Sequence, residues 1–258
     1  MFVDTHCHIH EERYPDAAGA VVRAHKAGVG KMICVGTDNL TSREAAQFSQ
    51  NHENVYFSVG THPHDSKEGY DEVIRIASGE NTKLVAIGEI GLDYFYTHSP
   101  REVQIAAFEA QLQLAVDRNL PVIFHVRDAV SPEKNTSVWH DFWPIFRNFP
   151  GVKGVLHSFT DSQKNMEKAL SEGLYVGVNG ISTFTKDEAQ MAMFDAIPLE
   201  KMLLETDAPF LTPAPNRGKV NEPAFVRHVA EYHAQRREIE LEHLARVTSA
   251  NASTLFSL

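Results

Sequence analysis

The sequence predicts a single (β/α)₈ barrel that spans residues 1–258 and carries one additional helix at its C-terminal end. Three observations support this fold class. Eight apolar, strand-like segments alternate with helical patterns, at intervals close to the about 30 residues of a βαβ unit. The length of 258 residues is close to that of a typical barrel of this kind. No Pro/Gly/Ser-rich linker or change of composition marks a domain boundary.

The predicted strands contain near-continuous apolar runs, such as Val-Ile-Phe at 122–124 and Met-Leu-Leu at 202–204. Such runs are typical of parallel strands that are buried on both faces. The eight predicted strands, in chain order, are Phe2–Ile9, Lys31–Thr37, Val55–Thr61, Leu84–Asp93, Pro121–Asp128, Gly154–Phe159, Leu174–Ile181 and Lys201–Pro209.

Between these strands lie helical patterns, of which Glu102–Arg118 is the clearest because Val103, Ala107, Ala110 and Leu114 recur at intervals of three and four. The stretch Ser131–Asn148 is less regular and is expected to contain a loop before its helix. The other predicted helices are Ser42–Asn51, Asp71–Ser78, Ser162–Glu172, with Ser162 as a candidate N-cap, Asp187–Ala196, Glu222–Arg237 and Glu240–Ser257. The last two give one helix more than the barrel requires.

Composition and charge narrow the classes of function. No apolar stretch approaches the about 18 residues of a membrane span, and Met1 leads directly into a predicted strand, so a cytoplasmic location is expected, with no membrane and no obligate protein partner. Two cysteines do not form a disulfide framework. The net charge of −10 argues against a protein that coats duplex DNA, so any nucleic-acid contact should be local and partly carried by metal cations.

Side chains that can bind metal lie near the C-terminal ends of five predicted strands, where such barrels build their sites. His6 and His8 are two residues apart on the first strand, so they face the same way. Each histidine alone could be a hydrogen-bonded core residue, and each carboxylate a salt-bridged one; the whole set together indicates a metal site. The candidate ligands are His6, His8, Glu89, His125, His157 and Asp207.

Four imidazoles and two carboxylates are more than one tetrahedral ion needs, so two ions with one bridging carboxylate are expected. Two such ions can activate a water and stabilise the leaving oxygen. By ligand softness, imidazole-rich ligation suits Zn, Mn or Fe better than Mg.

A second group of residues surrounds the candidate ligands. His62 follows the third strand at the rim, Arg127 shares the face of His125, and Arg217 lies in the loop after the eighth strand, a frequent phosphate position. An arginine fork matches phosphate oxygens, and Arg217 is expected to have no structural role, although a solvated loop arginine remains the alternative. Glu205 faces inward either as a supporting group or in a core ion pair.

Three further expectations concern side chains outside the ligand set. Asp4 shares the face of His6 and could support the site from deeper in the barrel. Strand alternation turns Cys7 to the opposite face. Five histidines in helical stretches are expected to be solvated: His25, His52, His228, His233 and His243.

Seven short motifs together resemble the TatD family of metal-dependent deoxyribonucleases, within the amidohydrolase-like barrels. They span nearly the whole chain: Asp-Thr-His-Cys-His at 4–8, Gly-Thr-His-Pro-His at 60–64, Ile-Gly-Glu-Ile-Gly-Leu-Asp-Tyr at 87–94, His-Val-Arg at 125–127, His-Ser-Phe-Thr at 157–160, Leu-Glu-Thr-Asp-Ala-Pro at 204–209 and Arg-Gly-Lys-Val-Asn-Glu-Pro at 217–223. The chain departs from the family pattern at Asp161, where a glycine is common, and over 129–140.

The resemblance implies the same six metal ligands with Glu89 as the bridge, and makes His62 and Arg217 contacts to substrate phosphate. It also implies a Mg-dependent nuclease acting at 3′ ends, while some relatives resemble D-aminoacyl-tRNA deacylases.

These observations predict a divalent-metal-dependent hydrolase of phosphodiester bonds, a deoxyribonuclease that acts at DNA 3′ ends through a metal-activated water and prefers single strands. Asp207 and Glu89 are the expected catalytic residues, with Asp207 orienting or deprotonating the water. Two ions are expected, Mg²⁺ or Mn²⁺ for activity with Zn²⁺ as a possible bound species. A D-aminoacyl-tRNA deacylase at the same centre and a metal-dependent binding protein without turnover remain open as alternatives.

Overall fold

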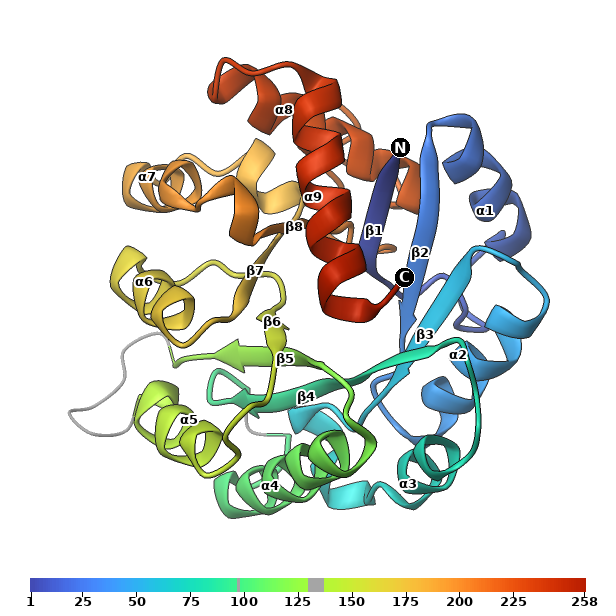
Figure 1. The fold of residues 1–258 in the computed structure, drawn as a ribbon, viewed down its shortest axis with the longest axis vertical. Coiled ribbons are helices and arrows are strands. Elements are labelled where there is room, and N and C mark those ends of the chain that lie inside the picture. Colours follow the sequence, from blue (N-terminus) through green and yellow to red (C-terminus); the bar gives the residue numbers. More distant parts are fainter. Residues whose placement is uncertain (97, 130–136) are drawn as a thin grey trace. The chain divides into compact units, whose positions relative to one another are not determined.

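The computed structural model describes residues 1–96, 98–129 and 137–258. Strands and helices alternate along the chain in the way that the sequence predicts (Figure 1), which confirms the (β/α)₈ fold class. The strands follow one another in the sheet in chain order: β1 Phe2–Cys7, β2 Val29–Val35, β3 Val55–Val59, β4 Leu84–Asp93, β5 Val122–Arg127, β6 Gly154–Leu156, β7 Tyr175–Val178 and β8 Met202–Leu204.

The observed strands are mostly shorter than the predicted ones at their C-terminal ends. The eighth strand shows why: β8 ends at Leu204, and over Glu205–Pro209 the regular ladder gives way to isolated backbone bonds, such as the Glu205 N–H to the Val178 carbonyl and the His8 N–H to the Ala208 carbonyl. Asp207 takes a left-handed backbone conformation with φ 57°, which no regular strand contains. The composition of such a segment therefore predicts a strand, although the structure forms a loop there.

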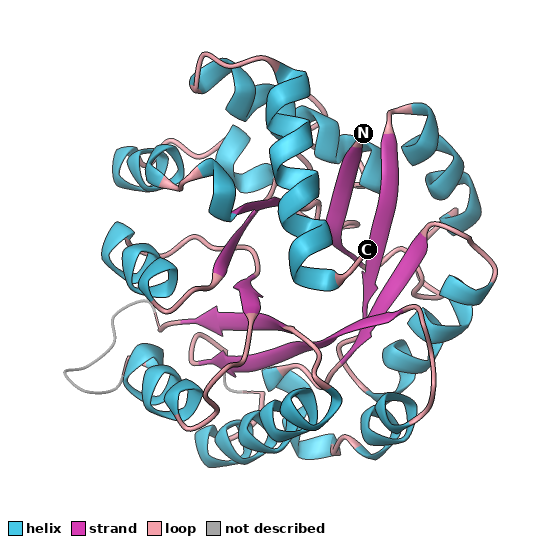
Figure 2. Cartoon of the chain, viewed as in Figure 1, coloured by secondary structure: helices cyan, strands magenta, loops and turns pink. Residues whose placement is uncertain are grey.

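The helices match the predicted patterns to within a few residues, and α9 is the additional C-terminal helix (Figure 2). Ser162 caps α6 as predicted, because its side chain accepts a hydrogen bond from the Asn165 N–H. The helices are α1 Ala17–Lys26, α2 Asn39–Gln50, α3 Asp71–Ser78, α4 Arg101–Arg118, α5 Val138–Arg147, α6 Gln163–Ser171, α7 Glu188–Ala196, α8 Val226–Arg236 and α9 Leu241–Phe256, with 3₁₀ helices η1 Pro63–Glu68, η2 Gly180–Thr183, η3 Leu199–Lys201 and η4 Pro223–Phe225.

Helix α1 is not among the predicted helices, although Ala20, Val21 and Ala24 form its buried face at helical spacing. The loop predicted at the start of Ser131–Asn148 falls on residues 131–136, which lie outside the described residues, whereas α5 is the helix predicted after it. Among the described helices, none combines the length and apolarity that crossing a membrane requires.

The chain divides into two compact units, and the assignment of residues 1–258 to a single domain stays a prediction. Unit one comprises residues 1–34, 52–56 and 155–258. In it β1 pairs with β2, and β7 pairs with both β6 and β8, all in parallel. Helix α9 packs on β1 and β8, and the Asn251 side-chain amide donates to the carbonyls of Leu199 and Met202, which ties α9 to the start of β8.

Unit two comprises residues 35–51 and 57–154. In it β4 pairs in parallel with β3 and with β5, and the register sets Gly91 opposite His125. Phe108 of α4, Phe124 of β5 and Phe142 of α5 form a buried aromatic cluster, with ring centroids 5.6 Å apart for Phe108–Phe142 and 5.4 Å for Phe124–Phe142. This cluster fixes β5 at the position next to His125.

Candidate metal centre

His6, His8 and Asp207 of unit one bring three metal-binding atoms together. The Nε2 atoms of His6 and His8 are 3.1 Å apart, and the Asp207 Oδ1 lies 3.7 Å from the first and 3.4 Å from the second. Tetrahedral ligands that bind at about 2.0–2.1 Å from an ion lie about 3.3 Å from one another. The spacing of the three atoms therefore fits the ligand shell of one divalent ion.

The backbone after β8 presents the Asp207 carboxylate to these imidazoles. The left-handed conformation of Asp207 is one that aspartate tolerates better than most residues, and its N–H donates to the His6 carbonyl at 2.8 Å. Burial acts to raise the pKa of Asp207, but the His8 hydrogen bond and the nearby imidazoles of His157 and His6 lower the pKa below its usual value. Asp207 is therefore an ionised carboxylate at neutral pH.

Asp4 supports this arrangement from below, as the sequence suggests. Its carboxyl group accepts from the Thr206 N–H at 2.9 Å and from the Thr206 hydroxyl at 2.6 Å, so it ties β1 to the segment that carries Asp207. Complete burial raises the pKa of Asp4 to about 8, although the bonds with Thr206 act in the opposite direction.

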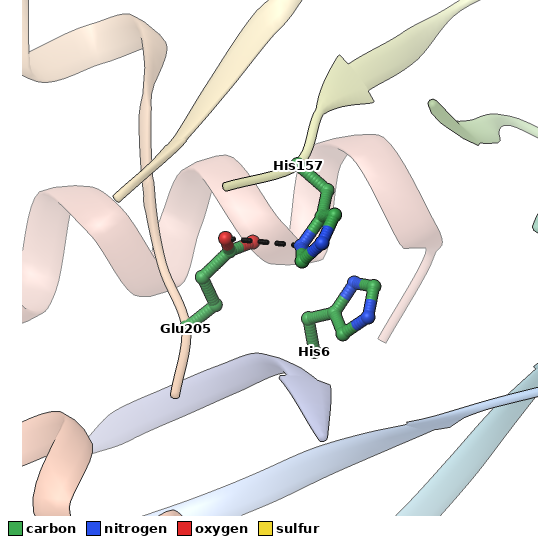
Figure 3. Close-up of side chains that lie close together, drawn as sticks. All are labelled: His6, His157 and Glu205. Carbon is green, nitrogen blue, oxygen red and sulfur yellow. Dashed lines mark ion pairs between the residues drawn. The ribbon is translucent and has the colours of Figure 1, made fainter. Parts of the chain in front are cut away.

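His157 and Glu205 extend the unit-one cluster (Figure 3). The His157 ring stacks on the His6 ring with centroids 3.6 Å apart, and its Nδ1 lies 3.1 Å from the Glu205 Oε1. Gly177 leaves room for this carboxylate, since a Cβ there would lie 2.5 Å from the Glu205 Oε2. The metal-binding atoms of His6, His157 and Glu205 all lie within 4.8 Å of one another, so Glu205 belongs to the donor set or orients His157.

Glu89, His125 and His62 form a second cluster, in unit two, with metal-binding atoms again within 4.8 Å of one another. The His125 Nδ1 lies 2.8 Å from the Glu89 Oε1, and the His62 Nε2 lies 3.6 Å from that oxygen. Gly91 lets β4 approach β5 here, because a Cβ at this residue would lie only 2.0 Å from the His125 carbonyl oxygen. A carboxylate with imidazoles is a donor set that suits a divalent transition metal.

The structure places His62 inside this cluster and buries it, whereas the sequence suggests a position at the rim. Burial, and then the neighbouring His125, hold the pKa of His62 well below its ordinary value, so the ring is neutral. Its Nδ1 accepts a hydrogen bond from the His64 N–H at 3.1 Å, which assigns the single ring proton to Nε2. In this tautomer His62 donates a hydrogen bond through Nε2 and does not bind a metal there.

Asp93 and His64 are site residues that the sequence reasoning does not single out. The buried Asp93 Oδ2 lies 2.9 Å from the His125 Nε2 and 3.1 Å from the His64 Nε2. Burial acts to raise the pKa of Asp93, but the bonds to His125 and His64 lower the pKa overall. The signal was present in the sequence, since Asp93 lies four residues after Glu89 on β4 and therefore on the same face.

Each of the two predicted phosphate-binding arginines lies over an aromatic ring. The Arg127 guanidinium carbon is 4.0 Å from the Phe95 ring centroid, and that of Arg217 is 3.8 Å from the Phe184 centroid. Arg217 also donates to the Thr212 carbonyl at 2.7 Å. The expectation that Arg217 has no structural role is therefore wrong, because it holds its own loop together.

Cys7 and His233 lie outside the two clusters. The Cys7 thiol donates to the Ile33 carbonyl on β2 at 3.4 Å, and both cysteines are free. The expectation that His233 is solvated is wrong: it is fully buried, with its Nε2 2.9 Å from the Ser182 hydroxyl. Histidine within a helical pattern can face either way, and here the inward face of α8 carries it.

The family model described as TatD related DNase matches residues 3–257. The chain is 34% identical to the metal-dependent hydrolase YabD of Bacillus subtilis, over the full length of both chains. It is 36% identical to the 3'-5' ssDNA/RNA exonuclease TatD of Citrobacter rodentium, over 92% of this chain and 90% of the relative. The crystal structure of the TatD homologue YjjV from Escherichia coli superposes with a TM-score of 0.88 and 28% identity, over 100% of this chain and 98% of that one.

These matches extend over almost the whole chain, and the two clusters present the side chains that a metal-dependent hydrolase requires. The number and identity of the ions, and the bridging role of Glu89, stay predictions. The chain belongs to the TatD-related DNase family and is a metal-dependent hydrolase.

Proposed function

We propose that this hydrolase cleaves the phosphodiester bonds of single-stranded DNA, starting at the 3′ end. The observation that carries the proposal is the convergence of the His6 Nε2, His8 Nε2 and Asp207 Oδ1 at 3.1–3.7 Å, which is the spacing of ligands around one divalent ion. The Citrobacter rodentium relative, which is named a 3'-5' ssDNA/RNA exonuclease, supports the choice of substrate.

Two divalent ions are proposed, Mg²⁺ or Mn²⁺ in activity and Zn²⁺ as a tightly held bound species, with His62 outside the ligand set. Such ions, when bound, lower the pKa of water and stabilise negative charge on phosphate oxygens. The proposed ligands are His6, His8, Glu89, His125, His157 and Asp207, and Glu205 lies close enough to join the first cluster.

The remaining roles are proposed for side chains of the protein itself. Asp207, ionised at neutral pH, is proposed to accept the proton of the attacking water at a carboxylate oxygen. His62 is proposed to donate its Nε2–H to a phosphate oxygen, because its Nδ1 is already engaged with the His64 N–H. Arg127 and Arg217 are proposed to bind the neighbouring phosphates through their guanidinium forks.

The test uses purified protein with Mg²⁺ or Mn²⁺ against three substrates: 3′-labelled single-stranded DNA, the same strand with a blocked 3′ end, and D-aminoacyl-tRNA. The proposal expects metal-dependent release of 3′ nucleotides from the free-ended strand and none from the blocked strand. Glu89→Gln should abolish the reaction, and Glu68→Gln, an exposed acid in η1, is the matched control. Faster hydrolysis of the aminoacyl ester than of DNA would replace this proposal with the deacylase alternative.

A further inference from the structure

Two exposed aromatic side chains follow the end of β4 beside the unit-two cluster. Phe95 is 38% exposed and Tyr96 is 40% exposed, although both are large rings. Their backbone N–H groups donate to the Asp93 Oδ1 at 2.9 Å each, while the other oxygen of Asp93 bonds His125. The backbone that carries the two rings is therefore tied, through Asp93, to the proposed metal ligand His125.

Arg127 completes a surface with these rings. Its guanidinium carbon lies 4.0 Å from the Phe95 centroid and 5.0 Å from the Tyr96 centroid, and the two rings pack edge to face at 4.6 Å. The His98 ring stacks on Tyr96 at 5.4 Å with an interplanar angle of 22°. A cation held against exposed rings presents π faces for stacking and N–H groups for an anion in the same place.

We infer that Phe95, Tyr96 and Arg127 form a stacking platform for an unpaired nucleobase, next to the phosphate that the Glu89–His125 cluster receives. This inference rests on the proposed function and specifies how the substrate is recognised. Two partly exposed rings, a cation over them and a proposed metal cluster beside them match the base, the backbone and the reacting group of one nucleotide.

The charge of the whole chain supports a base as the occupant. With a net charge of −10, the chain cannot rely on long-range attraction to the phosphate backbone. Stacking supplies affinity that does not depend on net charge, and it needs bases whose faces are not covered by a duplex. The platform therefore selects single strands, with little preference for sequence, because each base has a π face.

The experiment compares Tyr96→Leu, which keeps apolar bulk without the ring, with Tyr96→Phe, which keeps the ring. On a single-stranded oligonucleotide with Mn²⁺, Tyr96→Leu should raise KM roughly five- to hundredfold, and Tyr96→Phe should recover most of the loss. The metal content of Tyr96→Leu should equal that of the wild type. Equal KM values for Tyr96→Leu and the wild type would overturn the inference.

A second readout separates stacking from a structural effect of the substitution. Strands that carry one abasic residue are compared, with the abasic residue moved one position at a time from the 3′ end. At one position the abasic residue should raise the KM of the wild type but not that of Tyr96→Leu, because the ring and the base act as a pair. If the abasic residue and Tyr96→Leu each raise KM independently at every position, so that the two effects multiply, the stacking platform is overturned and the proposed function remains intact. Absence of hydrolysis on all strands would refute the proposed function, and this inference with it.

Discussion

Asp207 combines a left-handed backbone, an ionised and partly exposed carboxylate and two imidazoles within 3.7 Å. Asp207→Asn keeps the volume and removes the charge, so we expect metal-dependent hydrolysis to fall by about 100-fold or more. The melting temperature should change little, since the residue lies in a loop after β8 and outside the packed core. Steady-state kinetics and thermal unfolding measure the two effects. Glu188→Gln, an exposed acid in the first turn of α7, is the control. Wild-type turnover in Asp207→Asn at full metal occupancy would contradict the assignment.

At the scale of elements, Arg217 is proposed to bind substrate phosphate and also makes contacts within the loop after β8. Arg217→Ala removes the bond to the Thr212 carbonyl and the contact with Phe184. We expect the kcat/KM for DNA to fall roughly ten- to hundredfold, because a charge-assisted phosphate contact contributes about 1.5–3 kcal/mol. Arg217→Lys should recover only part of the activity, since an ammonium group cannot make a bidentate fork. Unchanged DNA kinetics in Arg217→Ala would show that the side chain acts on the loop alone.

A buried hydrogen bond between His233 and Ser182 joins α8 to η2. The Ser182 hydroxyl donates to the Asn179 carbonyl, so it accepts from the His233 Nε2–H. Burial, and then the nearby Arg237, lower the pKa of His233 to about 3. Below the ordinary pKa of about 6.5, His233 is protonated in the unfolded chain but stays neutral in the folded chain. The free energy of unfolding therefore falls as the pH falls from about 6.5 toward 3.

By pH 5 this linkage amounts to about 2 kcal/mol. Urea unfolding at pH 7 and at pH 5 should show a loss about 2 kcal/mol larger in the wild type than in His233→Gln. His243→Gln, on the exposed side of α9, should behave like the wild type. Parallel losses in the wild type and in His233→Gln would mean that His233 is accessible to protons in the folded protein.

At the scale of the whole molecule, 34 acidic residues outnumber 24 basic ones, which gives the net charge of −10. Such a chain lacks the electrostatic footprint for binding along internal duplex or circular backbone. We expect linear single strands to be trimmed while covalently closed single-stranded circles survive the same incubation with Mn²⁺. Gel analysis of an equimolar mixture of the two forms is the measurement. Nicking of the circles at a rate similar to that of trimming would show an endonuclease.

The fold was predictable because it depends on local patterns. Alternating apolar strands and helical periods determine a (β/α)₈ chain, and β4 was predicted to the residue. The ends of the other strands were predicted less well, because a strand ends where the regular ladder gives way to isolated backbone bonds and side-chain contacts, as at Glu205–Pro209 after β8. Such contacts join residues far apart in the sequence, for example the Thr5 hydroxyl and the Leu204 carbonyl.

The sequence by itself determined which residue types stand at the strand ends, and therefore the chemistry: imidazoles and carboxylates in the order of a metal-dependent hydrolase. Only the tertiary structure decided which of them touch. It joined Asp93 to His125 and Glu205 to His157, assigned the ring proton of His62, and buried His233. The physical reason is that these contacts are set by strand register and by the packing of segments distant along the chain, neither of which a local pattern of residues encodes.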